Sequence, residues 1–298
     1  MSTMKAAVFV EPGRIELVSK PIPSVGPNDA LIRITTTTIC GTDVHILKGE
    51  YPVAKGLTVG VMPEGFGTGA ALPAEELVKL SAETDQVVKD ALGGFEKAGA
   101  KVREMSVPMH ALGAAIYTPI FVEGICKQMI DGNGFSVGHK GYYPVEAMTA
   151  YGRARKAEGD NYSDLCKLIA LMGEYMFDRY QGRYYAKAQN LMLKLAAQLD
   201  AALNEVDVLV MPTMAPIGRA LKLTQPSFAD EYLDSYVLET FNYHVNTCPT
   251  DSTGHPAITV PCGRHDGMPV GMMMIGRKFD EATLLRIAHA FEQTGTYK

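Results

Sequence analysis

The feature that most constrains the fold of this chain is a change in sequence pattern near Gly60. Before it, short runs rich in β-branched and aromatic residues alternate with Pro and Gly, as in strands joined by turns. These runs are Val8–Val10, Ile15–Val18, Ala30–Thr35 and Ile34–Ile39. Beyond it, apolar runs of strand length alternate with longer segments of helical period. The pattern therefore predicts two parts, residues 1–60 and residues 61–298, which meet without a flexible linker.

The order of elements in the second part predicts an α/β fold. Strands are expected at Leu57–Met62 and Lys101–Val107, with a helix over Glu83–Lys97 between them. A β-α-β unit with a connection of this length pairs its strands in parallel. The other expected elements are helices over Asp164–Arg179, over Tyr184–Glu205 and from Asp280, and strands over Val206–Met211, Ala257–Val260 and Val270–Ile275. We therefore expect a sheet flanked by helices, with its most apolar strands buried on both faces.

The composition argues against several classes of partner. The 298 residues include 33 acidic and 28 basic side chains, for a net charge of −5, and no basic block stands out. Nucleic acid and anionic membrane surfaces are therefore not expected as partners. No continuous apolar run approaches the roughly 20 residues that span a bilayer, and no apolar stretch of secretory-signal length follows Met1. We expect a cytoplasmic protein with free thiols, since its five cysteines include no CxxC pair.

The most distinctive chemical stretch is Cys-Gly-Thr-Asp-Val-His at residues 40–45. Cys40 offers a soft thiolate ligand for a metal, and Thr42 and His45 offer a proton path beside it. A catalytic zinc needs about three protein ligands, and this stretch alone does not supply them. The spacing therefore leaves open both a metal site and a free thiol among polar side chains.

Residues 4–60, which contain this stretch, resemble the opening of a zinc-dependent medium-chain alcohol dehydrogenase. The resemblance implies a β-rich, GroES-like fragment with Cys40 as a zinc ligand. It also implies that Thr42 relays the substrate proton, with His45 further along the relay. Asp43 would hold the metal site in shape.

The chain departs from that family directly after Gly60. Where the family has His-Glu, whose histidine is the second zinc ligand, this chain has Val61-Met62. The sequence also lacks the four-cysteine zinc lobe and a dinucleotide-binding Gly-x-Gly-x-x-Gly unit. We therefore expect no cofactor: zinc at Cys40 would occupy an incomplete site, and Thr42 and His45 would be vestigial. The alternative is a zinc-binding, dehydrogenase-like oxidoreductase remnant.

Several motifs in the second part follow one another in a recognisable order. They are Gly-Val-Met-Pro-Glu-Gly-Phe-Gly at 60–67, Asp-Gly-Asn-Gly at 131–134, Asp-Val-Leu-Val-Met-Pro-Thr at 207–213, Thr-Gly-His-Pro-Ala at 253–257 and Gly-Met-Pro-Val-Gly at 267–271. Together they resemble the C-terminal part of an amidase-signature enzyme, over residues 57–298. The most similar type is the amidase found beside nitrile hydratases, which hydrolyses carboxamides to acids and ammonia. The resemblance implies an α/β fold with a mixed sheet flanked by helices.

The family uses a Ser–cis-Ser–Lys triad, in which burial lowers the pKa of the lysine until it accepts a proton. The two serines lie in a Gly-Gly-Ser-Ser-Gly type of segment, and no serine of this chain has that setting. The region that carries the triad precedes the Leu57 strand in the family, and dehydrogenase-like sequence takes its place here. We therefore expect an amidase-derived protein without hydrolase activity. A small carboxamide is the expected partner only if the alternative, an active amidase with an improvised site, holds.

The same resemblance places Thr250, Asp251 and Ser252 near the acyl pocket, as candidate substrate-binding residues. Thr250 and Ser252 stand where relatives often carry Phe and Val, which predicts a more polar pocket. A substitute triad of Asp251, Ser252 and His255 would lie in one short turn, and residues so close rarely align as nucleophile, base and orienting group. For His255 we expect a backbone carbonyl or a water molecule as partner.

The junction between the two parts also leads to a prediction about self-association. Residues 55–60 fit both families, so recombination, shuffling or misassembly there would preserve a strand. The amidase part would still lack the sheet and helices that normally pack against it. Exposed apolar surface, and hence self-association, is the expected consequence.

Overall fold

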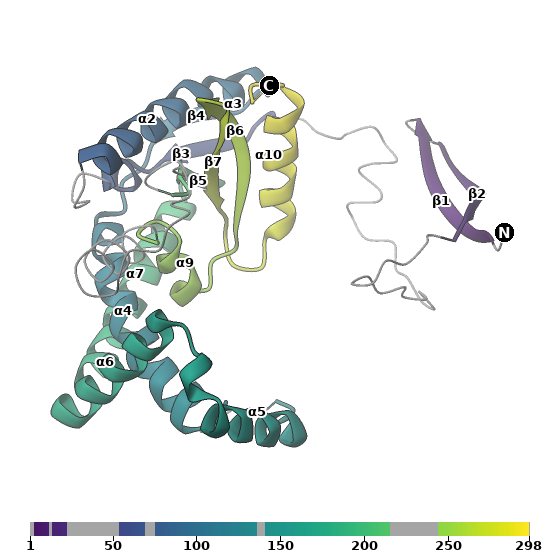
Figure 1. Cartoon of the computed structure of the whole chain (residues 1–298). Helices are drawn as coiled ribbons and strands as arrows, with labels where there is room; N and C mark the ends of the chain where they lie inside the picture. Colours follow the sequence, from purple (N-terminus) through teal and green to yellow (C-terminus); the bar gives the residue numbers. More distant parts are fainter. Residues whose placement is uncertain are drawn as a thin grey trace.

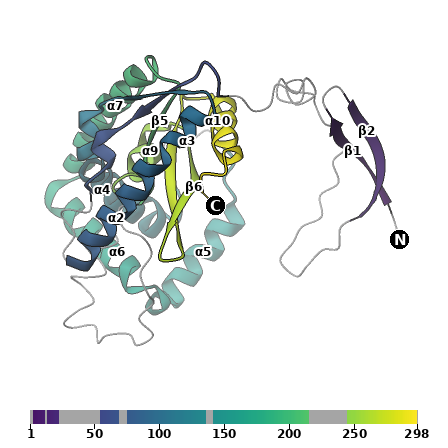
Figure 2. The ribbon, with the colours of Figure 1, turned by 90° about the horizontal axis from the view of Figure 1, so that it is seen from above.

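The computed structural model describes residues 3–11, 14–22, 54–68, 75–135, 141–214 and 244–297. From the first part of the chain it describes a hairpin, in which β1 (Thr3–Glu11) and β2 (Arg14–Pro21) pair antiparallel. Most of β2 is exposed, including 74% of Leu17, and the hairpin stands apart from the other elements in Figures 1 and 2. The other two expected strands, between residues 30 and 39, lie outside the described residues. The GroES-like fragment therefore stays a prediction.

The second part of the chain is built on a five-stranded sheet with the order β4-β3-β5-β7-β6. Its strands are β3 (Thr58–Val61), β4 (Lys101–Glu104), β5 (Val208–Pro212), β6 (Ala257–His265) and β7 (Met268–Ile275). β3 pairs in parallel with both β4 and β5, whereas β7 pairs antiparallel with both β5 and β6. The sheet is therefore mixed, as expected, and its β-α-β unit is parallel as predicted.

Helices pack on both faces of this sheet (Figure 2). One layer contains α2 (Glu75–Ala91), α3 (Gly93–Lys97) and α10 (Glu281–Gln293), and the other contains α7 (Arg183–Leu203). The single helix expected over residues 83–97 is thus two helices, because the pair Gly93-Gly94 follows the end of α2. The N-cap expected for the last helix is confirmed, since Asp280 accepts a hydrogen bond from the backbone N–H of Thr283.

Side chains of the central strands alternate between these two layers. Val208 and Val210 of β5 pack with α2 and α10, whereas Leu209 and Met211 pack with α7. Every residue of β5 is buried, which explains why its sequence is a continuous apolar run rather than an alternating one. The three consecutive methionines of β7 divide in the same way, with Met272 and Met274 in the first layer and Met273 in the second. They belong to the core, as predicted.

A second group of helices extends below the sheet in Figure 1. It consists of α4 (Gly113–Gly124), the π-helix η4 (Ile125–Asp131), α5 (Val145–Ala157) and α6 (Asp164–Tyr180). The shorter helices are η1 (Pro63–Gly65), η3 (Pro108–Leu112), η5 (Gly159–Asn161) and α9 (Cys248–Thr253). No amphipathic period marks α4 in the sequence, because α4 contacts three other helices, α6, α7 and α9.

One helical stretch among the described residues, Pro108–Asp131, is long and apolar enough to cross a membrane by length and composition alone. Its polar residues, such as Thr118 and Glu123, interrupt the apolar run, which is why the sequence shows no continuous apolar run of that length. Core helices of proteins that never enter a membrane pass the same test, and 33% of the apolar window is buried in this structure. The stretch is therefore weak evidence for a membrane segment.

The junction residue Gly60 lies at a point of close packing in the middle of β3. A Cβ atom there would lie 2.8 Å from Met105 Cβ and 3.0 Å from atoms of both Val206 and Leu209. Contacts that short do not occur between real Cβ atoms, and Met105 Cβ is bonded directly to the main chain. The sheet can accommodate a side chain at residue 60 only by moving backbone.

Gly60→Ala is therefore expected to lower the free energy of unfolding by about 1–3 kcal/mol, the usual cost of overpacking. Urea denaturation followed by circular dichroism measures it. Gly93→Ala is the matched control, because a Cβ at that helical position meets nothing within 4 Å, and alanine favours a helix over glycine. Equal losses of stability in the two variants would contradict the close-packing argument.

Candidate functional site

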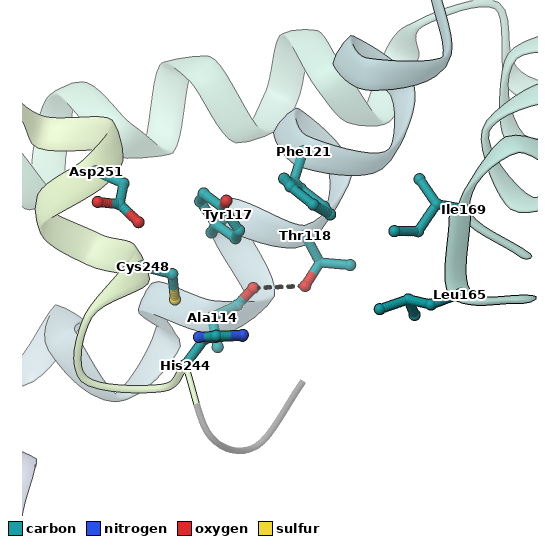
Figure 3. A pocket seen from close by; sticks show the side chains of 9 residues that line it. All are labelled: Ala114, Tyr117, Thr118, Phe121, Leu165, Ile169, His244, Cys248 and Asp251. Carbon is teal, nitrogen blue, oxygen red and sulfur yellow. Dashed lines mark hydrogen bonds between the residues drawn. The ribbon is translucent and has the colours of Figure 1, made fainter. Parts of the chain in front are cut away.

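A cavity of about 290 Å³ lies among α4, α6 and α9 (Figure 3). Its described lining is mostly apolar and consists of Ala114, Tyr117, Thr118, Phe121, Leu165, Ile169, His244, Cys248 and Asp251. The four α4 residues lie on one face of that helix. The Cys248 thiol and the Asp251 carboxyl group of α9 lie beside them. The Thr118 hydroxyl donates a hydrogen bond to the carbonyl of Ala114 at 2.8 Å. Its proton is therefore already used within α4.

The short helix α9 is held against α4 by its sequence. It starts with Cys248-Pro249, and proline is well tolerated at this position because the first N–H groups of a helix have no intrahelical partner. It ends at Gly254, whose φ of +73° is left-handed and whose N–H donates to the carbonyl of Thr250 at 3.0 Å. Gly113 of α4 allows the close approach, since a Cβ there would overlap the ring of Pro249.

The turn before α9 is fixed by a buried network around Asn246. Its side-chain amide donates to the carbonyls of Gly65 and Pro212, each at 2.8 Å. Its oxygen lies 3.1 Å from Nε2 of His110, which is fully buried. Since an amide oxygen only accepts, His110 Nε2 carries the proton in this pair, and burial lowers the pKa of His110. The network connects η1, β5 and η3 to the turn that carries His244 and Cys248.

Electrostatics inside the cavity favour neutral groups. Burial raises the pKa of the Cys248 thiol to about 12, and the nearby carboxylate of Asp251 adds to that rise. Burial also raises the pKa of Asp251, against an opposing effect of His244. The pKa of Tyr117 is raised by burial first, and then by Asp251 and Cys248. The cavity therefore suits an uncharged ligand better than an anion.

The candidate substrate-binding residues occupy three different environments. Asp251 lines the cavity. Thr250 is buried, and its hydroxyl donates to the carbonyl of Thr247 at 2.8 Å. Ser252 is half-buried on α9 and, like Thr250, is not part of the described lining. The three dehydrogenase-like candidates Cys40, Thr42 and His45 all lie outside the described residues.

The expected partner of His255 was wrong. Its Nδ1 lies 3.0 Å from the hydroxyl of Thr253 and its Nε2 lies 3.1 Å from a carboxylate oxygen of Asp200. Side chains thus satisfy both nitrogens, because the turn folds His255 back against the exposed end of α7. Burial lowers the pKa of His255, and its side chain is fully enclosed. His255 is therefore bonded to neither Asp251 nor Ser252, its partners in the substitute triad.

Residues that sequence reasoning missed make up most of the cavity lining. Tyr117 and Phe121 come from α4, Leu165 and Ile169 come from α6, and Cys248 comes from α9. The pairs on α4 and α6 are each four residues apart, which is the spacing of one helical face. That four-residue spacing is the sequence signal that could have identified these pairs. In α4, however, apolar residues lie on several sides of the helix, so the spacing does not single out the face toward the cavity.

Among the described residues, Cys126, Asp131 and Glu174 are close enough together to hold a metal ion. The ammonium group of Lys127 already lies within this group, 2.7 Å from Asp131 and 2.8 Å from Glu174. Burial and the hydrogen bond to Glu174 raise the pKa of the Cys126 thiol to about 12. A lysine cation therefore balances these carboxylates, and the thiol is a poor metal ligand.

The fold is that of an amidase. A crystal structure of an amidase matches 85% of this chain and 49% of its own, with a TM-score of 0.54 and 19% sequence identity. The Amidase family model matches residues 33–285, and the chain belongs to that family. The enantioselective amidase of Rhodococcus rhodochrous is 35% identical over 243 residues, which are 81% of this chain and 44% of that enzyme. The chain thus spans about half the length of the curated relatives it matches.

A second relationship covers a different segment. Over 63 residues the chain is 87% identical to an alcohol dehydrogenase of Cupriavidus necator, which is 21% of this chain and 17% of the dehydrogenase. The two relationships confirm that the chain is a chimera of dehydrogenase-like and amidase sequence.

Proposed function

We propose that this chain is an amidase-derived protein that does not hydrolyse carboxamides. The observation that carries the proposal is the described cavity lining, which includes neither a serine nor a lysine. An amidase-signature mechanism needs a serine nucleophile and a lysine that accepts its proton. The segment that would supply both precedes β3 in the family, and the dehydrogenase-like sequence replaces it here.

An improvised site is the first alternative, and Cys248 is its best nucleophile. His244 and Asp251 line the same cavity, so a thiol, an imidazole and a carboxyl group lie on one side of it, on α9 and the turn before it (Figure 3). The thiolate is the reactive form of cysteine. With a pKa of about 12, to which both burial and the carboxylate of Asp251 contribute, only about one thiol in 100,000 is ionised at neutral pH. The arrangement therefore lacks an activated nucleophile.

The property that the amidase part retains is a binding surface. The rings of Tyr117 and Phe121 and the aliphatic chains of Leu165 and Ile169 suit the acyl side of a small neutral carboxamide. Binding without turnover is the activity that such a cavity supports.

The purified chain is expected to release no ammonia from acetamide, propionamide or benzamide above the level of a Cys248→Ala/Asp251→Asn double variant. The reason is the missing nucleophile and base, since removing two side chains from an inactive cavity changes nothing. A glutamate-dehydrogenase-coupled ammonia assay measures it over hours. Ammonia release by the natural chain that the double variant lacks would refute the proposal and establish the improvised site.

A zinc-binding oxidoreductase remnant is the second alternative, favoured by the 87% identity to an alcohol dehydrogenase over 63 residues. We propose that it does not function, because Cys40 is a lone ligand where a catalytic zinc needs about three. After dialysis against buffer with zinc, elemental analysis should find far less than one zinc per chain, with no difference between the natural chain and Cys40→Ser. Stoichiometric zinc lost in Cys40→Ser, together with NAD(H) binding, would contradict this.

We also propose that the chain self-associates, since large apolar side chains are exposed on its helices. On α6, Leu171 and Tyr175 are 69% and 61% exposed and lie four residues apart on one face. Sedimentation velocity across a concentration series should show growing oligomers in the natural chain and fewer in Leu171→Glu. A single monomeric species at all concentrations would count against self-association.

A further inference from the structure

The turn Asp-Gly-Asn-Gly at 131–134 starts at the last residue of the π-helix η4 and contains the single Asn-Gly pair of the sequence. Asn133 has a φ of +51° and Gly134 has a φ of +85°. Asparagine tolerates the left-handed region better than most residues do, and glycine adopts it freely. The pair suits the turn for this reason. Because Gly134 has no Cβ, its backbone nitrogen is also unhindered, which makes an Asn-Gly pair prone to deamidation.

Deamidation of such a pair needs no reactant other than water. The backbone nitrogen of Gly134 gives its proton to solvent and attacks Cγ of Asn133. A C–N bond forms, and the side-chain nitrogen takes up a proton and leaves as ammonia. A water molecule then opens the cyclic imide at either of its carbonyls, which yields aspartate or isoaspartate. The attack therefore requires a free N–H at Gly134 and an Asn133 side chain that can turn toward it.

The fold restrains both of these groups. The N–H of Gly134 donates to the carbonyl of Gln128 at 2.7 Å. The side-chain oxygen of Asn133 accepts from two nitrogens of Arg155, Nε at 3.3 Å and Nη2 at 3.2 Å, and a guanidinium holds such donors in a fixed fork. The amide also lies against Gly152 of α5, where a Cβ would lie 2.8 Å from the amide nitrogen. The amide is thereby held against α5 and away from its attacking nitrogen.

The restrained amide is still within reach of water. Asn133 is half-buried, and with Gly134 and Tyr151 it lines an open cavity of about 300 Å³ between the turn and α5. The contacts of Asn133 also attach α5, most of whose residues are exposed. Isoaspartate adds a methylene group to the main chain. It therefore lengthens the turn and moves the side chain away from Arg155.

We propose that Asn133 is a spontaneous deamidation site whose rate the fold limits through Arg155, and that its conversion to isoaspartate releases α5. The limit is kinetic, because the side chain must leave the guanidinium before Gly134 can attack it. Conversion to aspartate has a milder effect on α5, since the new carboxylate keeps the guanidinium as its partner.

The test follows deamidation of the full chain at neutral pH by peptide mapping with mass spectrometry, and detects isoaspartate by enzymatic methylation. The folded chain is expected to convert Asn133 at least about tenfold more slowly than the same chain unfolded in guanidinium chloride. Arg155→Met keeps a long, helix-favouring side chain without its donors, and it should deamidate about tenfold faster than the natural chain. Arg153→Met, at an exposed position of α5, is the matched control and should deamidate as the natural chain does.

Equal rates in the folded and unfolded chain, or in Arg155→Met and Arg153→Met, would overturn the proposal, because the fold would then place no restraint on Asn133. Slower deamidation in Arg155→Met would overturn it in the opposite sense, since the guanidinium would then activate the amide. If Arg155 only stabilised α5, its substitution would lower the unfolding temperature and leave the rate below that temperature unchanged. Should Arg155→Met fail to fold, the comparison of the folded and unfolded natural chain still tests the restraint.

The release of α5 has its own measurement. Hydrogen exchange of residues 145–157 in the aged natural chain is expected to quicken in proportion to its isoaspartate content. Unchanged protection of these residues in chains that contain isoaspartate would contradict the release.

Discussion

The amidase part of this structure depends on the carboxylate of Asp207, which joins three strands at one end of the sheet. One of its oxygens accepts the backbone N–H of Thr58 at 2.8 Å, while its own N–H donates to the carbonyl of Thr58. The other oxygen accepts from Arg277, which also donates to the carbonyl of Val206 at 2.9 Å. β3, β5 and the end of β7 are thereby fixed in register by one side chain. Hydrogen bonds to a charged group contribute about 1.5–3 kcal/mol each. Asp207 therefore contributes more to the free energy of unfolding than a typical surface acid does.

The junction falls on β3, the strand whose first residue, Thr58, is held by this carboxylate. β3 is the strand that connects the two parts, and it lies between β4 and β5 in the sheet. The dehydrogenase-like sequence still ends in residues that pair correctly, because a four-residue strand needs only a compatible apolar pattern and the close-packed Gly60. Apart from Ala54 and from Val59 of β3 itself, the buried residues of the two core clusters follow β3. We propose that the junction replaces the segment that carries the nucleophile in amidases, so that the fold is kept on one side of this strand and the chemistry is lost on the other.

The elements predicted best from sequence are those in which apolar residues recur at a regular spacing within the element itself. The strands around Val208 and Met272, the amphipathic helices α6 and α7 and the Asp280 cap all show in the order of apolar residues. The helices α4 and α5 do not show, because α4 contacts several helices at once and α5 exposes most of its length. The cavity wall was missing from the sequence prediction for the same reason. Asp251 was found through a motif, whereas the cavity wall comes from helices that no motif marks.

The cavity beside Asp251 combines groups whose burial disfavours their charged forms. Burial raises the pKa of Tyr117, Cys248 and Asp251, while His244 opposes the rise at Asp251. Because α4, α6 and α9 all follow β3, the described walls of this cavity form without the dehydrogenase-like segment. We therefore propose that binding of a small neutral ligand there depends on residues of the amidase part alone, whereas hydrolysis would require the serine nucleophile and lysine base that the family carries upstream of β3.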